Sequence, residues 1–170
     1  MLKTLWQIHR IGVVTEPAPA ADAQLLAQAQ LAAQIRARLG RALCIRHVDA
    51  GSCNGCELEI HALNNPLYNL EGQGVRFVAS PRHADVLLVT GPVSRNMAAA
   101  LRSTYEATPA PKLVVALGDC GCTGGVFAAS SAVLGPVARV IPVDLSVPGC
   151  PPEPSRILQA ILSLLARAGR

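Results

Sequence analysis

The stretch LCIRHVDAGSCNGCELEI, residues 43–60, contains the first strand-to-helix transition of the chain and its first pair of closely spaced cysteines. Its opening apolar run, 43–48, predicts a buried strand, and the segment 54–63 predicts a helix that follows a short glycine-bearing loop. The alternation continues along the chain, with strands expected at 75–79, 85–90, 113–117 and 137–143 and helices at 96–107 and 153–168. Near-continuous apolar strands separated by helices indicate an α/β fold, a parallel sheet covered on both faces.

The first forty residues differ from this pattern. Residues 1–13 carry an incomplete helical stripe, the proline-bearing segment 16–20 breaks any helix, and Asp22 is expected to cap a helix that runs to about Leu39. We therefore divide the chain into an N-terminal helical docking arm, 1–40, and an α/β domain, 41–170. The arm is expected to dock on a partner or a membrane surface, and the alternative is a helix packed on its own domain.

Composition restricts the function classes. Charged residues make up 15% of the chain, against about 25% in a typical soluble domain. Either partner subunits cover part of the surface, or a bias toward alanine raises the apolar count. The net charge of +4 is scattered and aromatic residues reach only 3%, which argues against nucleic-acid binding. No apolar run is long enough to span a bilayer and no signal peptide is evident, so a cytoplasmic location is expected.

The six cysteines argue for metal or redox chemistry before disulfides in such a chain. Cys53 and Cys56 follow the first expected strand, Cys120 follows the strand 113–117, and Cys150 follows the last strand. Because the carboxyl ends of parallel strands meet at one edge of a sheet, these four thiols are expected to converge there. Cys122 competes with Cys120, whose place at the strand end favours it, while Cys44 lies inside the first strand and is expected to be a small buried side chain.

The residues around these cysteines favour an iron–sulfur cluster. C-x-x-C stands at the mouth of a helix, a glycine-rich loop surrounds Cys120, and Cys150 is followed by proline, as in many iron–sulfur ligand sets. A thioredoxin-type pair would not need the Gly-Cys-Pro-Pro segment. A structural zinc site usually uses two close pairs, which the separations of 64 and 30 residues between successive loops do not resemble.

The motif RHVDAGSCNGCE at 46–57, the Gly118-Asp119-Cys120 loop and the Pro148-Gly149-Cys150-Pro151-Pro152 turn resemble the small subunit of membrane-bound [NiFe] hydrogenases. That family includes the formate hydrogenlyase small subunit and, more distantly, the quinone-site cluster subunit of respiratory NADH dehydrogenase. The resemblance covers nearly the whole chain. The dehydrogenase branch typically carries two adjacent cysteines where this chain has C-N-G-C, so the hydrogenase branch is favoured.

The resemblance implies a flavodoxin-like fold with one [4Fe–4S] cluster on Cys53, Cys56, Cys120 and Cys150. It implies an electron-relay subunit, not catalytic alone, that lies against a [NiFe] large subunit with ferredoxin-like and membrane subunits nearby, on the inner face of the cell membrane. One alternative is a quinone- or sulfur-reducing complex without nickel. A stand-alone metal-binding module with no electron role is the other.

Several polar residues lie near the first cysteine pair, and the sequence indicates their roles less clearly than those of the cysteines. Glu57 and Glu59 follow the second cysteine, where a carboxyl group either relays protons or serves the helix dipole. His47 and Asp49 border the same edge and receive no role. Backbone amides of glycines 51, 121 and 149 are expected to donate hydrogen bonds to the cluster.

Overall fold

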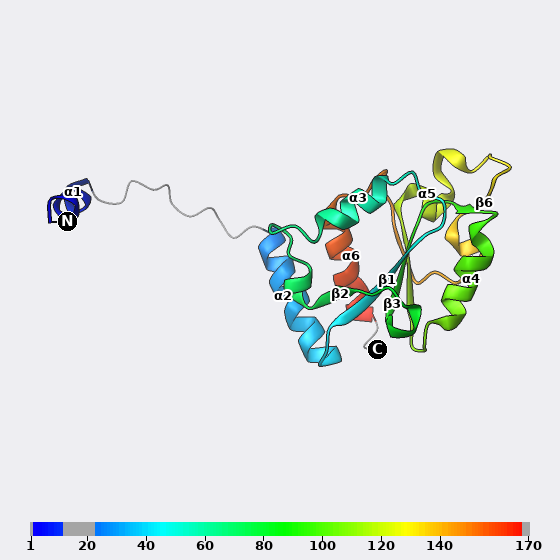
Figure 1. Cartoon of the computed structure of the whole chain (residues 1–170), viewed down its shortest axis with the longest axis horizontal. Coiled ribbons are helices and arrows are strands. Elements are labelled where there is room, and N and C mark those ends of the chain that lie inside the picture. The colour runs from blue at the N-terminus through cyan, green and yellow to red at the C-terminus, as the bar shows by residue number, and fades with distance from the viewer. Residues whose placement is uncertain (1, 12–22, 168–170) are drawn as a thin grey trace.

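The computed structural model describes residues 2–11 and 23–167, and its centre is a five-stranded parallel sheet (Figure 1). The sheet strands are β1 (Leu43–Asp49), β2 (Val75–Phe77), β3 (Val86–Thr90), β5 (Leu113–Leu117) and β7 (Leu145–Val147). They lie in the order β2-β1-β3-β5-β7, and all neighbours are parallel. Counted in chain order within this sheet, that is 2-1-3-4-5, the flavodoxin-like arrangement. The predicted fold class is confirmed.

Helices cover both faces of the sheet (Figure 1). One face packs against α2 (Ala23–Leu39), α3 (Gly55–Ala62) and α6 (Pro154–Arg167), and the other against α4 (Met97–Ala107) and the 3-10 turn η4 (Val137–Arg139). Successive residues of each strand point to opposite faces, so Leu88 joins the first core while Leu87 and Val89 join the second. Both cores are therefore built from the same short strands.

The N-terminal part has two described helices, α1 (Leu2–Ile11) and α2. Leu31 and Ile35 of α2 are buried in the core that also contains α6, and Arg38 Nη1 donates a 2.8 Å hydrogen bond to the Leu165 carbonyl. Helix α2 thus forms part of the layer over the sheet. The expected cap at Asp22 lies outside the described residues, and the division at residue 40 stays a prediction.

The expected strand at 137–143 is wrong. Residues Val137–Arg139 form η4, and the last strand of the sheet is Leu145–Val147. Val137 and Ile141 are both buried on the α4 side of the sheet, and Ile141 N donates to Val137 O at 3.1 Å. Their spacing of four residues is helical, and its one-sided burial differs from the alternation of a strand. The apolar composition of this segment was therefore misleading.

The remaining elements are short. The 3-10 turns η1 (Glu71–Gln73), η2 (Pro81–His83) and η3 (Gly125–Phe127) connect larger elements, as does α5 (Gly118–Thr123). Strands β4 (Val93–Ser94) and β6 (Val133–Gly135) pair antiparallel as a separate ribbon. Within 2–11 and 23–167, no helix has both the length and the apolar character that a bilayer crossing requires.

Candidate metal centre

Four cysteines from three loops line one cavity at the carboxyl edge of the sheet. Cys53 and Cys56 follow β1, Cys120 lies in α5 directly after β5, and Cys150 comes three residues after the end of β7. Figure 1 places α3 and α5 at this same end of the sheet. The cavity has a volume of about 120 Å³, and its other lining residues are Ser52, Gly55, Asp119, Gly149 and Pro151. The structure therefore brings together the four thiols that the sequence singled out.

The first cysteine loop is held by its own polar groups. Asp49 Oδ1 accepts hydrogen bonds from the backbone amides of Gly51 and Ser52, at 2.8 and 2.7 Å. Asn54 adopts a left-handed conformation with φ of 72°, and α3 begins at the next residue. This turn places Cys53 before the helix and Cys56 in its first turn.

The loops that carry Cys120 and Cys150 are bonded to each other. Asp119 N donates to Gly149 O at 2.8 Å, and Gly149 N donates back to Asp119 Oδ1 at 2.8 Å. The expectation that the amides of Gly51 and Gly149 donate to a cluster is therefore wrong, because nearby carboxylates accept both hydrogen atoms. The sequence motif gave Asp119 no role, although its position directly before Cys120 could have indicated one.

Glycine is required where the backbone approaches the sulfur atoms. An added Cβ at Gly118, whose φ is +81°, would lie 2.6 Å from Cys56 Sγ. An added Cβ at Gly125, with φ of +52°, would lie 2.8 Å from Cys120 Sγ. Both positions combine a left-handed backbone with a contact that no side chain can occupy without displacing a thiol.

The thiols lie in an environment that disfavours isolated thiolates. Burial, the Glu57 carboxylate and the three other cysteines raise the pKa of Cys56 to about 12. Burial, together with Cys150, Cys53 and Asp119, also raises the pKa of Cys120. Desolvation at Cys56 therefore outweighs the stabilisation of a thiolate that the N-terminus of α3 offers. Four converging thiolates require a compensating positive charge, which a metal centre supplies.

The donor set fits a polynuclear cluster better than a single ion. Among the described residues, no three histidine, cysteine or acidic side chains lie close enough to hold one metal ion. A tetrahedral zinc with sulfur ligands needs sulfur atoms about 3.8 Å apart, given its bond length. A four-iron cluster instead binds one thiolate at each iron and so accepts a wider ring of four cysteines. The four cysteines around one cavity offer one thiolate for each iron of such a cluster.

The two remaining cysteines lie away from this cavity. Cys122 Sγ lies 3.5 Å from Ala116 O, and the side chain packs against the core on the α4 side. Cys44 lies near the beginning of β1, half-buried, with its Sγ 3.8 Å from Ala42 O. Of these two candidates for the third position, Cys120 lines the cavity and Cys122 does not.

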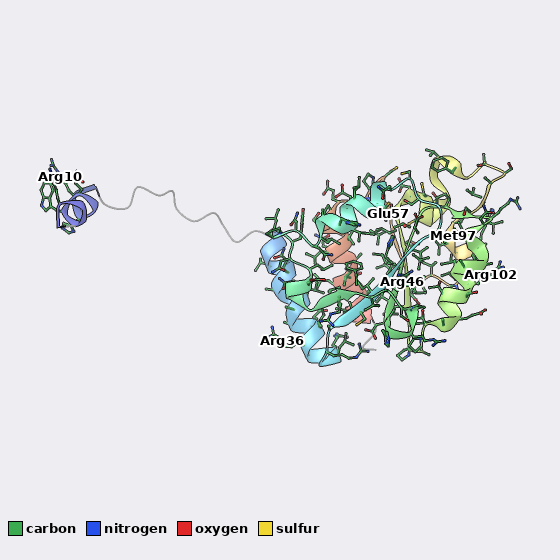
Figure 2. The ribbon with its side chains drawn as sticks, in the orientation of Figure 1. Arg10, Arg36, Arg46, Glu57, Met97 and Arg102 are labelled. Carbon is green, nitrogen blue, oxygen red and sulfur yellow. The ribbon has the colours of Figure 1, made fainter. Side chains whose placement is uncertain are left out.

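A buried polar network adjoins the first cysteine pair. Glu57, labelled in Figure 2, is 8% exposed. Its Oε2 accepts a 2.8 Å hydrogen bond from Ser52 Oγ. His47 Nε2 lies 2.9 Å from Thr90 Oγ1 and 3.5 Å from Glu57 Oε1, and burial lowers the pKa of this imidazole. Sequence reasoning gave Ser52 and Thr90 no part in this network. Glu59 is half-exposed and does not line the cavity, and a proton-relay role for Glu57 or Glu59 stays a prediction.

Comparisons with known proteins agree with the family that the sequence resembles. A family described as NADH ubiquinone oxidoreductase, 20 Kd subunit, matches residues 53–164. A probable membrane-bound hydrogenase subunit, mbhJ of Pyrococcus furiosus, is 46% identical over 138 residues, which are 81% of this chain and 83% of that protein. Formate hydrogenlyase subunit 7 of Escherichia coli is 41% identical over 130 residues, which are 76% of this chain but only 51% of that protein.

A solved structure supports the same relationship. One chain of the membrane-bound sulfane sulfur reductase, an archaeal respiratory membrane complex, aligns with a TM-score of 0.65 and 29% identity. The alignment covers 85% of this chain and 75% of that chain.

Proposed function

This chain belongs to the family of the NADH ubiquinone oxidoreductase 20 Kd subunit, and from that membership we propose that it carries electrons in an oxidoreductase complex. The proposed cofactor is one [4Fe–4S] cluster bound by Cys53, Cys56, Cys120 and Cys150. The proposed complex is of the membrane-bound hydrogenase type, with a [NiFe] large subunit, ferredoxin-like subunits and membrane subunits as partners. The chain would lie on the inner face of the membrane through those partners.

The observation that carries this proposal is the convergence of four thiols from three loops on one cavity. When bound, the cluster supplies a one-electron redox couple. The residues of this chain hold it in place: Asp49 fixes the first loop, the Asp119–Gly149 pair fixes the other two, and Gly118 leaves room for Cys56. Buried strands behind the cavity keep these loops at fixed separations.

The nickel site of such a complex belongs to a partner subunit. The family resemblance implies that nickel is held by four cysteine thiolates. Four of the six cysteines line the cavity, so only Cys44 and Cys122 remain for another metal. One is near the start of β1 and the other is in α5, at opposite ends of the sheet. The chain is therefore proposed to be a redox relay and not the site of hydrogen chemistry.

A second candidate is favoured by the structural comparison. The sulfane sulfur reductase likeness supports a complex that reduces sulfur or quinone without nickel. The higher identity of 46% to a hydrogenase subunit keeps the hydrogenase type in first place. The partner large subunit discriminates between the two, because paired C-x-x-C motifs near both of its ends indicate nickel and their absence indicates the alternative.

Replacement of single cysteines tests the ligand set. The full chain is reconstituted anaerobically with ferrous iron and sulfide, and iron per chain, visible absorbance and the paramagnetic signal of the reduced state are measured. Cys53→Ser and Cys150→Ser should abolish the cluster signals, while the matched control Cys44→Ser should keep them. If wild-type protein binds no iron, or if Cys44→Ser removes the cluster and Cys150→Ser does not, the proposal fails.

A further inference from the structure

We propose that Asp119 is a positioning residue that locks the Cys120 loop to the Cys150 loop and adds negative charge beside the cluster. The inference rests on the proposed function, since it assumes that both thiolates bind one cluster. It assigns a separate task to a side chain that is not itself a ligand. The task has a geometric part and an electrostatic part, and these parts can be measured independently.

The geometric part is a reciprocal pair of hydrogen bonds. Asp119 and Gly149 each immediately precede a cysteine of the cavity, and they are separated by thirty residues in sequence. The backbone of Asp119 donates to Gly149 O, and the backbone of Gly149 donates to the Asp119 side chain, both at 2.8 Å. The first bond survives any substitution at 119 except proline, whereas the second depends on a side-chain acceptor. The side chain thus decides whether one or two bonds join the loops.

The Cys150 loop depends on this second bond because it has few other donors. Pro148, Pro151 and Pro152 carry no backbone N–H, so within 148–152 only Gly149 and Cys150 can donate from the main chain. Gly149 has a φ of +144°, and a Cβ there would lie 2.6 Å from Pro152 Cα. The neighbouring strand β7 has three residues, and among the described strands it pairs only with β5. A turn anchored on an edge strand this short gains much of its order from one additional bond.

The electrostatic part follows from the carboxylate itself. Asp119 lines the cavity with the cysteines, and its charge acts on the Cys120 thiol. A negative charge near the cluster disfavours the reduced form, which is more negative than the oxidised form. An asparagine at 119 keeps an oxygen that accepts the Gly149 hydrogen bond but removes the charge. An alanine removes both.

The chain offers a matched control at the other end of the same two strands. Asp144 Oδ2 accepts from Val114 N at 2.7 Å, and Asp144 N donates to Val114 O at 2.9 Å. This pair has the same reciprocal pattern and also ties β5 to the segment of β7. It lies at the amino edge of the sheet, where no cysteine of the cavity stands. If weaker attachment of β7 to β5 were enough to destabilise the cluster, Asp144→Ala would lose its cluster faster than wild type, as Asp119→Ala is expected to do.

The experiment compares wild type, Asp119→Ala, Asp119→Asn and Asp144→Ala as full chains reconstituted with ferrous iron and sulfide. We expect Asp119→Ala to lose its cluster absorbance to an added iron chelator about tenfold faster than wild type or more, since it loses a hydrogen bond to a charged group. Asp119→Asn should keep nearly the wild-type rate and show a midpoint potential shifted to a more positive value. Asp144→Ala should keep both the wild-type rate and the wild-type potential.

The outcomes separate this inference from the proposed function. Failure of wild-type protein to bind iron overturns the proposed function and the inference with it. A wild-type cluster together with an unchanged rate in Asp119→Ala overturns the inference alone. Equal acceleration in Asp144→Ala, or an Asp119→Asn variant as labile as Asp119→Ala, overturns it as well, and an unshifted potential in Asp119→Asn overturns its electrostatic part.

Discussion

Replacement of Gly118 by alanine should displace a cysteine sulfur without touching any cysteine. The φ of Gly118 is +81°, and an added Cβ would lie 2.6 Å from Cys56 Sγ and 3.5 Å from Gly149 O. Non-bonded carbon atoms are optimally about 3.5–4.0 Å apart, so the new methyl group overlaps the sulfur by roughly 1 Å. Relief of that overlap requires movement of Cys56, which is 8% exposed and packed in the core. The variant should therefore bind less iron than wild type.

Gly40→Ala provides the matched control for the backbone contribution. Its φ is +62°, and an added Cβ would meet no atom within 4 Å. A left-handed conformation costs a non-glycine residue about 1–2 kcal/mol. Both variants carry that cost, but only Gly118→Ala adds an overpacking cost of about 1–3 kcal/mol. The free energy of unfolding should therefore fall by about 1–2 kcal/mol in Gly40→Ala and by about 2–5 kcal/mol in Gly118→Ala.

Two measurements on the reconstituted full chains test this comparison. Thermal unfolding followed by circular dichroism should show the larger decrease in Tm for Gly118→Ala, at about 2–4 °C for each kcal/mol in a chain of this size. The iron content per chain should fall in Gly118→Ala and remain at the wild-type value in Gly40→Ala. A Gly118→Ala variant that holds as much iron as Gly40→Ala would refute the argument that this glycine makes room for Cys56.

Three further substitutions test the ligand choice, the core and the opposite edge of the sheet. Cys120→Ser should abolish iron binding while Cys122→Ser retains it, as measured by iron analysis, because only the first side chain lines the cavity; iron loss in Cys122→Ser alone would reverse the assignment. Leu101→Ala should lower the free energy of unfolding in urea by about 2–5 kcal/mol, since this side chain is fully buried, whereas Leu58→Ala, at 63% exposure, should change it by no more than about 0.5 kcal/mol. Asp85→Ala should lower the free energy of unfolding by about 1–3 kcal/mol with unchanged iron content, because its carboxylate accepts from the backbone amide of Cys44, at the edge of the sheet opposite to the four cavity cysteines; loss of iron there would contradict the separation of the two edges.

The elements that sequence analysis predicted correctly are those whose signal is local. The apolar runs that became β3 and β5 are buried on both faces, and their composition alone indicates a parallel sheet. The last strand was misplaced because its three residues include the exposed Ser146 and lack a continuous apolar run. Its position depends on pairing with β5, an interaction that no local pattern records.

The candidate site was also predictable from the sequence only in part. Strand ends carry cysteines, and parallel strands present those ends at one edge, so the convergence of the loops was predictable from order along the chain. The choice between Cys120 and Cys122 depended on which side of α5 faces the cavity. Two residues along a helix point to nearly opposite sides, and only packing against the second core orients Cys122 away from the edge.

The fold class and the three loops that carry the thiols of the candidate site follow from the sequence alone, because apolar periodicity and the positions of strand ends are properties of short segments. The assembled fold was needed to show that Gly51 and Gly149 donate to aspartates and that Asp119 joins two loops thirty residues apart. A hydrogen bond forms only when the acceptor lies within about 3 Å of the donor, and these loops come that close only after the sheet has assembled.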